Sequence, residues 1–486
     1  MSAPEVIASE APPTEAPSLP PLSTLTARAR REPRAGLDLS KHIRAAAACD
    51  PLRYNGKVVQ VVGLTIESQG PSCQVGEVCK VHTRGGRAIP AEVVGFRQER
   101  VVLMPLGDMS GIEPGCEVVS TGDPLLVPVG RALLGRVLDG LGRPMDGLEP
   151  PDCDQLYPVT ASPPDPLRRR RIAEPLELGI RAIDGVLTVG KGQRIGIFSG
   201  AGVGKSTLLG MIARNTRAEV NVIGLVGERG REVREFIERD LGEEGLRRSV
   251  VVCATSDAPA VVRLKAAMTA TTVAEFFRDQ GVDVILMMDS VTRVAFAQRE
   301  MGLALGEPPA TRGYTPSVFA MLPRLLERSG CSDRGAITGL YTVLVEGDDM
   351  TEPVADQVKS ILDGHIVLSR ELAEQNHYPS IDILQSVSRS MPDITTREHR
   401  EAANRARDVL ATHREAQDLI NIGAYVPGSN PKIDHARAMI DRVRQYLRQD
   451  VNVKSAAEEA TEELLLLLGD GVPGQSGTRG GLSLAG

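Results

Sequence analysis

The stretch Ser199-Gly200-Ala201-Gly202-Val203-Gly204-Lys205-Ser206-Thr207 decides how the middle of this chain folds. An apolar run that ends at Phe198 precedes it, and the apolar helical segment Leu208–Ile212 follows it. Glycines let the backbone curl so that several N–H groups point at one anion, and the following helix adds the positive end of its dipole. A strand, a glycine-rich loop and a helix in this order predict a loop that binds phosphate.

We expect this loop to hold the phosphates of ATP. The expected contact residues are Gly200, Ala201, Gly202, Val203, Gly204, Lys205, Ser206 and Thr207. In loops of this kind the lysine, here Lys205, reaches the β- and γ-phosphates, and the hydroxyl of Ser206 binds Mg²⁺. The usual pattern G-x-x-x-x-G-K-[ST] has glycine where Ser199 stands, but that position shapes the turn and does not grip phosphate. An incidental glycine-rich turn is the competing interpretation, and the register of strand, loop and helix disfavours it.

Two carboxylates follow neighbouring apolar runs. Asp289 closes the run Ile285–Met288, and a carboxylate at a strand end can hold the metal directly or through water. A cap on the next helix explains Asp289 equally well. Glu228 follows the run that ends at Val226, and ligands bind at the carboxyl ends of parallel strands, so we expect Glu228 to position the attacking water. Arg229 beside it is a further candidate for contact with the nucleotide, although Glu-Arg pairs are usually surface charges.

An arginine often stabilises the charge that develops on the γ-phosphate in the transition state. Arg389, in Ser386-Val387-Ser388-Arg389-Ser390, follows the apolar stretch Ile381–Leu384 and is the candidate for this role. A surface arginine in a polar loop explains the same pattern. Chemistry alone does not distinguish Arg389 from the other arginines of the chain.

Composition and periodicity divide the chain into five parts. Residues 1–36 are rich in Pro, Ala, Ser and Glu, and we expect a disordered arm. Short β-rich runs between Gly and Pro turns predict a short helix and a small β-barrel over 37–122. Apolar runs that alternate with helical stretches predict a parallel-sheet domain over 123–392. Residues 393–468 are predicted to be helical, and 469–486 form a Gly/Ser-rich tail, expected to be disordered. The predicted fold class is therefore α/β, with a barrel before the sheet and helices after it.

The composition narrows the class of protein. The 486 residues are 42% hydrophobic and 24% charged, which is typical of a soluble globular protein. A formal net charge of −7 argues against a general nucleic-acid binder, so no nucleic-acid partner is expected. The seven cysteines include no CxxC pair, which argues against a zinc site or a disulfide framework. We find no secretory signal and no apolar run of about eighteen residues that could span a membrane.

Several of these stretches resemble a known family. Phe198–Thr207, Gly227–Glu232 and the strand before Asp289 resemble the catalytic subunits of rotary ATP synthases and their relatives. A narrower resemblance is to the flagellar protein-export ATPase, and it extends from about Gly56 to Leu447. The stretches that carry it are Gly302–Phe319, Tyr341–Met350 and Asp363–Leu372.

This resemblance implies an N-terminal barrel, a central RecA-like P-loop ATPase domain and a C-terminal helical domain. It implies that Glu228 is the catalytic glutamate, and that Arg389 is an arginine finger donated in trans to the site of the neighbouring subunit. Tyr378, in Asn376-His377-Tyr378-Pro379, resembles the residue that stacks on adenine. A packed loop aromatic before proline explains Tyr378 equally well.

The resemblance also implies partners and a location. The protein is expected to form a homohexameric ring by head-to-tail contacts, on the cytoplasmic side of the inner membrane at the base of the flagellar export apparatus. Other implied partners are a central stalk-like export protein, the membrane export gate by peripheral contact, and export chaperones and substrates at the C-terminal helices, near Arg414–Lys432. A regulatory stator-like protein is expected on the arm before Arg34, although a solvated linker is the simpler interpretation of its basic cluster.

Four other functions fit parts of the pattern. The ATPase of a virulence-type secretion system has the same site chemistry, and only the barrel stretch Val61–Ser68 favours the flagellar branch. A true ATP synthase subunit is disfavoured by the Pro-rich arm and by Asp363–Leu372. An RNA-translocating helicase would need a basic, aromatic N-terminal domain. A scaffold that binds nucleotide without hydrolysis is disfavoured because Glu228 and Lys205 are both present.

Overall fold

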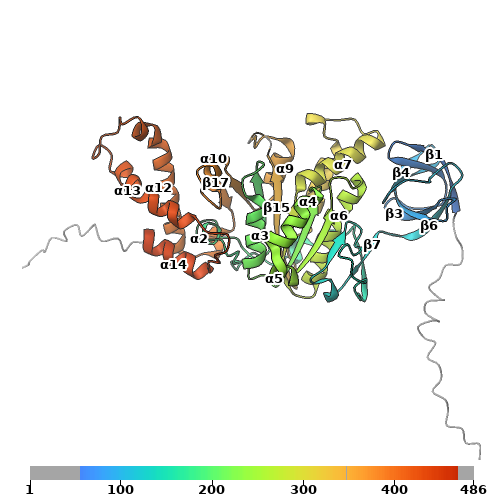
Figure 1. Cartoon of the computed structure of the whole chain (residues 1–486), viewed down its shortest axis with the longest axis horizontal. Helices are drawn as coiled ribbons and strands as arrows, with labels where there is room; N and C mark the ends of the chain where they lie inside the picture. Colours follow the sequence, from blue (N-terminus) through green and yellow to red (C-terminus); the bar gives the residue numbers. More distant parts are fainter. Residues whose placement is uncertain (1–54, 346, 348, 469–486) are drawn as a thin grey trace, which may run out of the picture. The chain divides into compact units, whose positions relative to one another are not determined.

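The computed structural model describes residues 55–345, 347 and 349–468, and all statements about the structure refer to these residues (Figure 1). The predicted arm over 1–36, the short helix expected near its end and the predicted tail over 469–486 lie outside them. None of the described helices is long and apolar enough to cross a membrane.

Six antiparallel strands form the predicted N-terminal barrel, in the closed order β1-β2-β5-β4-β3-β6. The strands are β1 Asn55–Val62, β2 Thr65–Gln69, β3 Glu77–His82, β4 Ala88–Arg97, β5 Arg100–Pro105 and β6 Glu117–Pro124. Side chains such as Val81, Leu103 and Val118 are fully buried inside the barrel. A closed barrel leaves no strand edge unpaired, which explains how such short strands are stable.

A connecting region joins the barrel to the central sheet. Its elements are β7 Leu126–Val129, the 3-10 helix η2 Arg131–Leu133, β8 Val137–Asp139, β9 Gln155–Pro158 and the 3-10 helix η3 Pro166–Arg168. β7 and β9 pair with each other as a separate antiparallel ribbon, whereas β8 joins the edge of the central sheet next to β12. A turn that contains Gly140 and Gly142 follows β8 directly.

The central sheet has nine strands, in the order β17-β16-β10-β15-β13-β11-β12-β8 with β14 paired to β15. In chain order the elements are α2 Arg181–Val186, β10 Arg194–Ser199, α3 Lys205–Asn215, β11 Val220–Val226, α4 Gly230–Glu235, the π-helix η4 Phe236–Leu241, α5 Gly242–Arg247, β12 Ser249–Ala254, α6 Ala260–Asp279, β13 Asp283–Asp289, α7 Val291–Leu305, the 3-10 helix η5 Thr311–Gly313, α8 Pro316–Leu326, β14 Gly330–Cys331, β15 Ala336–Leu344, α9 Pro353–Ile361, β16 Gly364–Leu368, α10 Arg370–Glu374 and β17 Ile381–Ser388. Among the described strands of this sheet, only β14 and β17 run antiparallel to their neighbours.

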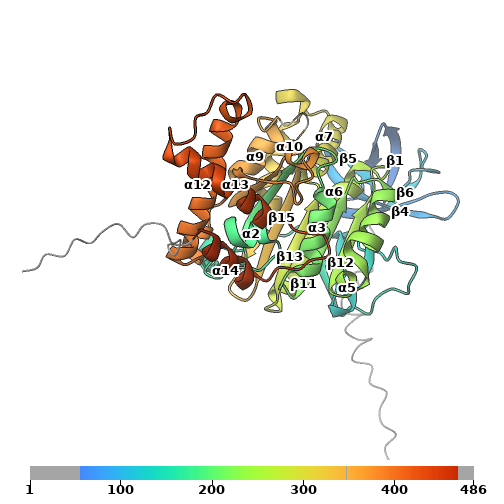
Figure 2. The ribbon, with the colours of Figure 1, turned by 60° about the vertical axis from the view of Figure 1, so that its left-hand side comes forward.

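Helices cover both faces of this sheet, which explains why central strands such as β11 and β13 are almost wholly apolar (Figure 2). Along β13, Leu286 and Met288 pack in the hydrophobic cluster that contains α6 and α7. Ile285 and Met287 point to the opposite face and pack in the cluster that contains α3. The predicted doubly covered α/β sheet is therefore confirmed.

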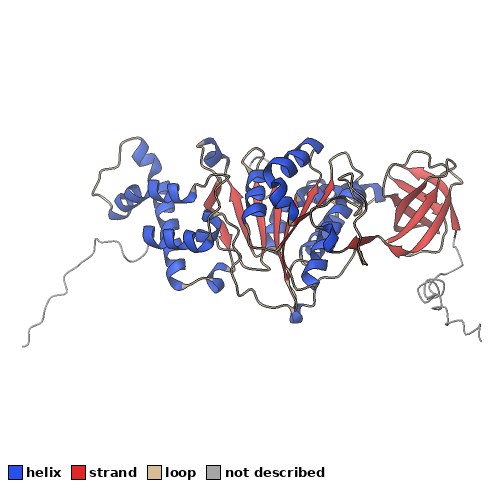
Figure 3. Ribbon diagram, turned by 60° about the horizontal axis from the view of Figure 1, so that its bottom comes forward, coloured by secondary structure: helices blue, strands red, loops and turns tan. Residues whose placement is uncertain are grey.

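After β17 the regular elements of the described chain are all helices (Figure 3). The helices are α11 Met391–Ile394, α12 Arg397–Asn421, α13 Pro431–Leu447 and α14 Ala457–Leu468. The buried side chains of α12 include Ala402, Ala406 and Val409, which are spaced by three and four residues on one face. This apolar face packs against the remaining helices and against α2, so the predicted C-terminal helical domain is confirmed.

A buried ion pair joins the barrel to the central domain. Lys265 Nζ on α6 lies 2.6 Å from Glu92 Oε1 on β4, and both side chains are less than a tenth exposed. An ammonium group in this position is stable because the carboxylate compensates for the water that it loses. The pair fixes which face of the barrel contacts α6.

We expect Glu92→Gln to reduce the free energy of unfolding by about 3 kcal/mol or more, because the Lys265 charge would remain buried without its counter-ion. The combined replacement of Glu92 by Leu and Lys265 by Met should cost less, since it removes both charges. Urea unfolding measures these changes. The control is Glu235→Gln, which breaks the exposed Arg231–Glu235 pair and should change stability by less than about 1 kcal/mol. Equal effects of the two single variants would contradict the assignment.

Candidate active site

The predicted phosphate loop lies at the carboxyl end of β10, between β15 and β16 near the middle of the sheet. α3 begins at Lys205, directly after Gly204, whose φ of 88° lies in the left-handed region that favours glycine. A side chain at Gly204 would also contact the ring of Tyr378. The exposed Ser206 lies in the first turn of α3, where the free N–H groups of a helix face outward.

The structure brings Lys205 together with both predicted carboxylates. Lys205 Nζ lies 2.5 Å from Asp289 Oδ1 and 3.7 Å from Glu228 Oε1. Asp289 also accepts a hydrogen bond of 2.7 Å from the Thr342 hydroxyl on β15. β13 and β11 are adjacent and parallel, with Leu225 opposite Asp289, so the two carboxylates come from neighbouring strand ends. Three segments far apart in sequence therefore meet at one point of the sheet edge.

Burial and the neighbouring charges shift the pKa values of Glu228 and Lys205. Burial and the charge of Asp289 raise the pKa of Glu228 to about 7, against the opposing pull of Lys205 and Arg293. Burial lowers the pKa of Lys205, but the charges of Asp289 and Glu228 outweigh it and keep the pKa above its ordinary value. The lysine is therefore always charged at neutral pH, whereas Glu228 is close to the point where it can exchange a proton.

Arg293 is a further candidate residue that the sequence did not indicate. It lies in the first turn of α7, and its stem packs against Gly227, where an added side chain would lie 2.8 Å from Arg293 Cβ. The Nε atom of Arg293 is buried without a hydrogen-bond partner, and the Arg293 charge lowers the pKa of Glu228. The signal that could have found it is its position one helical turn after Asp289. The unpaired Nε–H of Arg293, beside Glu228, can donate a hydrogen bond to a phosphate oxygen.

Tyr378 lines a cavity of about 320 Å³ beside the loop. The cavity lies against Gly204 and the first two turns of α3, and its other walls are largely apolar. Ser380 donates a hydrogen bond of 2.7 Å to the carbonyl of Val203, which holds the Tyr378 segment against the loop. A flat aromatic wall next to a phosphate loop has the geometry that a stacked nucleotide base requires.

The two remaining predicted residues do not reach this cluster. Arg229 is mostly exposed and pairs with Glu232, with 3.0 Å between Arg229 Nη1 and Glu232 Oε1. Arg389 follows β17, and the β16–β17 register places Ile381 at the loop end of the sheet but Ser388 at the opposite end. At about 3.3 Å per residue, Arg389 is separated from its own phosphate loop by roughly 20 Å along the strand.

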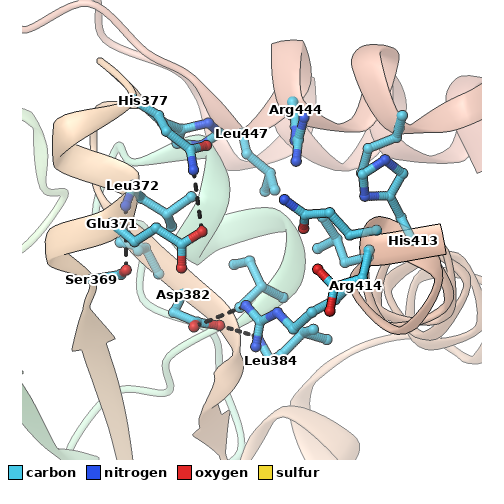
Figure 4. Close-up of a pocket in the computed structure, with 17 residues that line it drawn as sticks. Ser369, Glu371, Leu372, His377, Asp382, Leu384, His413, Arg414, Arg444 and Leu447 are labelled. Carbon is cyan, nitrogen blue, oxygen red and sulfur yellow. Dashed lines mark hydrogen bonds and ion pairs between the residues drawn. The ribbon is translucent and has the colours of Figure 1, made fainter. Parts of the chain in front are cut away.

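A second cavity, of about 330 Å³, lies between the α10–β17 region and helices α12 and α13 (Figure 4). Arg414 on α12 spans it, with Nη2 3.0 Å from Asp382 Oδ2 on β17. His377 and His413 also line it, and burial lowers the pKa of both imidazoles, that of His377 to about 4. Both rings are therefore neutral at physiological pH. This cavity is separated from the phosphate loop by the segment that carries Tyr378.

The residues at the loop fit a magnesium ion that arrives with a nucleotide. Mg²⁺ takes hard oxygen ligands, usually one or two from the protein and the rest from phosphates and water. The Ser206 hydroxyl and the Asp289 carboxylate supply such oxygens. Glu228 Oε1 is buried without a hydrogen-bond partner, because 3.7 Å from Lys205 is too long for a hydrogen bond. An unsatisfied buried carboxylate oxygen at this point indicates a place for a water that donates a hydrogen bond to it.

Comparison with known proteins agrees with this geometry. The sequence model of the ATP synthase alpha/beta family, nucleotide-binding domain, matches residues 179–388, and that of the family's beta-barrel domain matches 58–122. The model of the T3SS EscN ATPase C-terminal domain matches 395–465. The flagellum-specific ATP synthase of Bacillus subtilis is 55% identical over 423 residues, which cover 87% of this chain and 97% of that protein. The chain belongs to the ATP synthase alpha/beta family.

Two further similar proteins come from type III secretion systems. The type 3 secretion system ATPase of Xanthomonas euvesicatoria is 52% identical over 86% of this chain and 95% of that protein. Among solved structures, the assembled ATPase EscN from the type III secretion system of enteropathogenic E. coli has a TM-score of 0.81 and 47% identity, covering 85% of this chain and all of that one. The three-part fold and the ATPase class are thus shown.

Because Glu228 must be ionised to accept a proton from water, kcat/KM should fall about tenfold per pH unit below pH 7. The acidic limb should have an apparent pKa near 7, above the ordinary range of a glutamate. Steady-state ATP hydrolysis from pH 5 to 9, with a stability check at each pH, measures it. An acidic limb with a pKa between 4 and 5 would contradict the role of Glu228 as the base.

We expect Tyr378→Ala to raise KM for ATP about tenfold with little change in kcat, because the predicted role of the ring is to stack on adenine and not to bind the phosphates. Tyr378→Phe keeps the ring and is the matched control, so its kinetics should stay close to those of the unchanged protein. Steady-state kinetics on the purified proteins decide the matter. If Tyr378→Phe raises KM for ATP as much as Tyr378→Ala does, the function of Tyr378 is not to stack on adenine.

Proposed function

We propose that this ATPase hydrolyses ATP to drive the delivery and export of flagellar proteins through a flagellar type III secretion apparatus. The observation that carries the hydrolytic part is the buried Lys205 between Asp289 and Glu228 at the end of three parallel strands. The flagellar part rests on likeness, since the relatives from Bacillus subtilis, Pseudomonas aeruginosa and Treponema pallidum, at 50–55% identity, are named flagellum-specific ATP synthases.

The roles that we assign follow from charge and position. Lys205 binds the β- and γ-phosphates, whose charge replaces part of its present pairing with Asp289. Glu228 takes a proton from the attacking water, for which a pKa near 7 is well matched. Arg293 stabilises negative charge on the far side of Glu228. Mg²⁺, held by Ser206 and by Asp289 directly or through water, neutralises phosphate charge when bound.

Arg389 completes the site of a neighbouring copy in this proposal. Its position at the sheet end opposite its own loop supports donation in trans. A surface that carries Glu228 on one side and Arg389 on the other generates head-to-tail contacts, which close into a ring when the rotation fits. EscN is described as an assembled ATPase, and we propose a homohexamer for this chain.

Further partners and the location follow from the same likeness. EscN has also been solved in complex with its central stalk EscO, so we propose a stalk-like partner here. The α12–α13 connection exposes Ile422 and Val426, which are 75% and 67% exposed and suit such a contact. We further propose chaperone and substrate binding at these helices, a stator-like partner on the N-terminal arm, and a cytoplasmic position peripheral to the inner membrane beside the export gate.

The second candidate function is the ATPase of a virulence-type secretion system. The 52% identity to the Xanthomonas protein favours it nearly as strongly. Expression in a strain that lacks its flagellar export ATPase distinguishes the two. Restored swimming with no restored effector secretion in the corresponding secretion mutant supports the flagellar function, and the reverse result supports the alternative.

Mixing two inactive variants tests the shared site. Glu228→Gln removes the proposed general base, and Arg389→Ala removes the arginine proposed to act in trans. The kcat of each variant alone should therefore fall about a thousandfold or more. In mixed rings about a quarter of the contacts join an intact Glu228 to an intact Arg389. ATPase activity should therefore reappear on mixing, measured under conditions that permit subunit exchange.

The unmixed variants, at the same total concentration and with nucleotide binding verified, are the controls. Specific activity of the unchanged protein should also rise with protein concentration, as ring assembly requires. A fully active Arg389→Ala variant, together with activity that does not depend on concentration, would place the whole site within one subunit and overturn the ring mechanism.

A further inference from the structure

The cavity beside the phosphate loop has one wall from outside the central sheet. This wall is the connector 448–456, which joins α13 to α14 and contributes Gln449 and Val451 to the cavity lining. Arg214, in the last turn of α3, donates a hydrogen bond of 3.0 Å from Nη2 to the carbonyl of Val451. The C-terminal helices therefore return to the site through this connector and lie against the helix that begins with Lys205.

Gln449 is the most thoroughly bonded residue of the connector. Its Oε1 accepts a hydrogen bond of 2.8 Å from the N–H of Arg181, and its Nε2 donates to the carbonyls of Gly179 at 2.9 Å and Val453 at 2.7 Å. Its own N–H donates to the carbonyl of Tyr378 at 3.0 Å. The side chain is 6% exposed. One residue thus ties the connector to the core on one side and to the aromatic wall on the other.

The segment that carries Tyr378 needs such an anchor, because cavities lie on both of its sides. Gln375 and His377 line the cavity of Figure 4, whereas Tyr378 and Ser380 line the cavity beside the loop. Close packing, which normally fixes a buried segment, is therefore incomplete here. The hydrogen bond from Gln449 to the Tyr378 carbonyl supplies a fixed point between the two cavities.

We propose that Gln449 is a positioning residue for the nucleotide base. It holds the Tyr378 ring and the connector at the separation that admits a base between them, and it acts through these two walls. The hydrogen bonds of Gln449 go to Arg181, Gly179, Val453 and Tyr378 and, among the described residues, to none of those that we assign to phosphate, so we expect its influence to be confined to the nucleotide base. The inference rests on the proposed function, because it takes the cavity beside the loop as the base site.

The test compares a ligand that has a base with one that has none. The variant is Gln449→Glu, which keeps the shape but places a carboxylate oxygen against the carbonyls of Gly179 and Val453. We expect the dissociation constant of Mg-ADP, measured by calorimetry on the full chain, to rise about tenfold, since about two hydrogen bonds are lost. The constant for Mg-tripolyphosphate should stay within about twofold of the unchanged protein, because this ligand has no base.

Two further variants keep the outcome interpretable. Lys454→Met, at an exposed position of the same connector, should leave both constants unchanged. Gln449→Met, which keeps the length without the charge, should weaken Mg-ADP alone in the same way, and it replaces Gln449→Glu if that variant does not fold. Unchanged Mg-ADP binding, or equal weakening of both ligands, would overturn the proposal. Both ligands are measured without turnover, so an unchanged protein that binds them but hydrolyses no ATP would contradict only the proposed function.

Discussion

In a parallel sheet the carboxyl ends of all strands lie along one side of the sheet, here called its carboxyl edge. The position of the candidate site depends on this constraint. β10 ends in the phosphate loop, β11 ends two residues before Glu228, and β13 ends at Asp289. None of these three segments is close to another in sequence. Because β15 separates β10 from β13 and β11 lies beyond β13, the ammonium of Lys205 is the group that reaches across to both carboxylates.

The charges at this edge are balanced before any ligand binds. Lys205 and Arg293 provide two cations, and Asp289 and Glu228 provide two anions, all of them largely removed from water. The negative charge of Glu228 is the least well stabilised of the four, since its Oε1 has no hydrogen-bond partner and its pKa is raised. A buried group with a strongly perturbed pKa in such a position is typical of catalytic sites. The physical cause is the same sheet edge that crowds the four groups together.

Two features connect this edge to regions outside the subunit's own sheet. β17 runs antiparallel to β16, and its direction takes Arg389 away from the loop that β10 carries. In the proposed ring, the two halves of each shared site would come from opposite ends of the sheets of two neighbouring subunits. The connector 448–456 links the phosphate-loop region to the C-terminal helices. Gln449 bonds the connector to the core, and Arg214 on α3 bonds to the connector.

The sequence by itself determined the three-part fold, the phosphate loop and the two carboxylates. Each of these is local: an apolar run followed by Gly-rich residues, or by one acid, is visible within a dozen residues. Long apolar strands also predicted a sheet covered on both faces, because only such a sheet buries every side chain of β13 from Val284 to Asp289. The loop and the acids could be placed at one edge because parallel strands leave no other arrangement.

Only the tertiary structure decided which other side chains reach that edge. Arg229 is adjacent to Glu228 in sequence, yet the start of α4 turns it outward to Glu232, whereas Arg293 arrives from another helix. Gln449 lies more than two hundred residues from the loop and contacts its surroundings through hydrogen bonds that no local pattern encodes. The physical reason is that packing and buried hydrogen bonds join positions according to the path of the whole chain, and periodicity reports only the local part of that path.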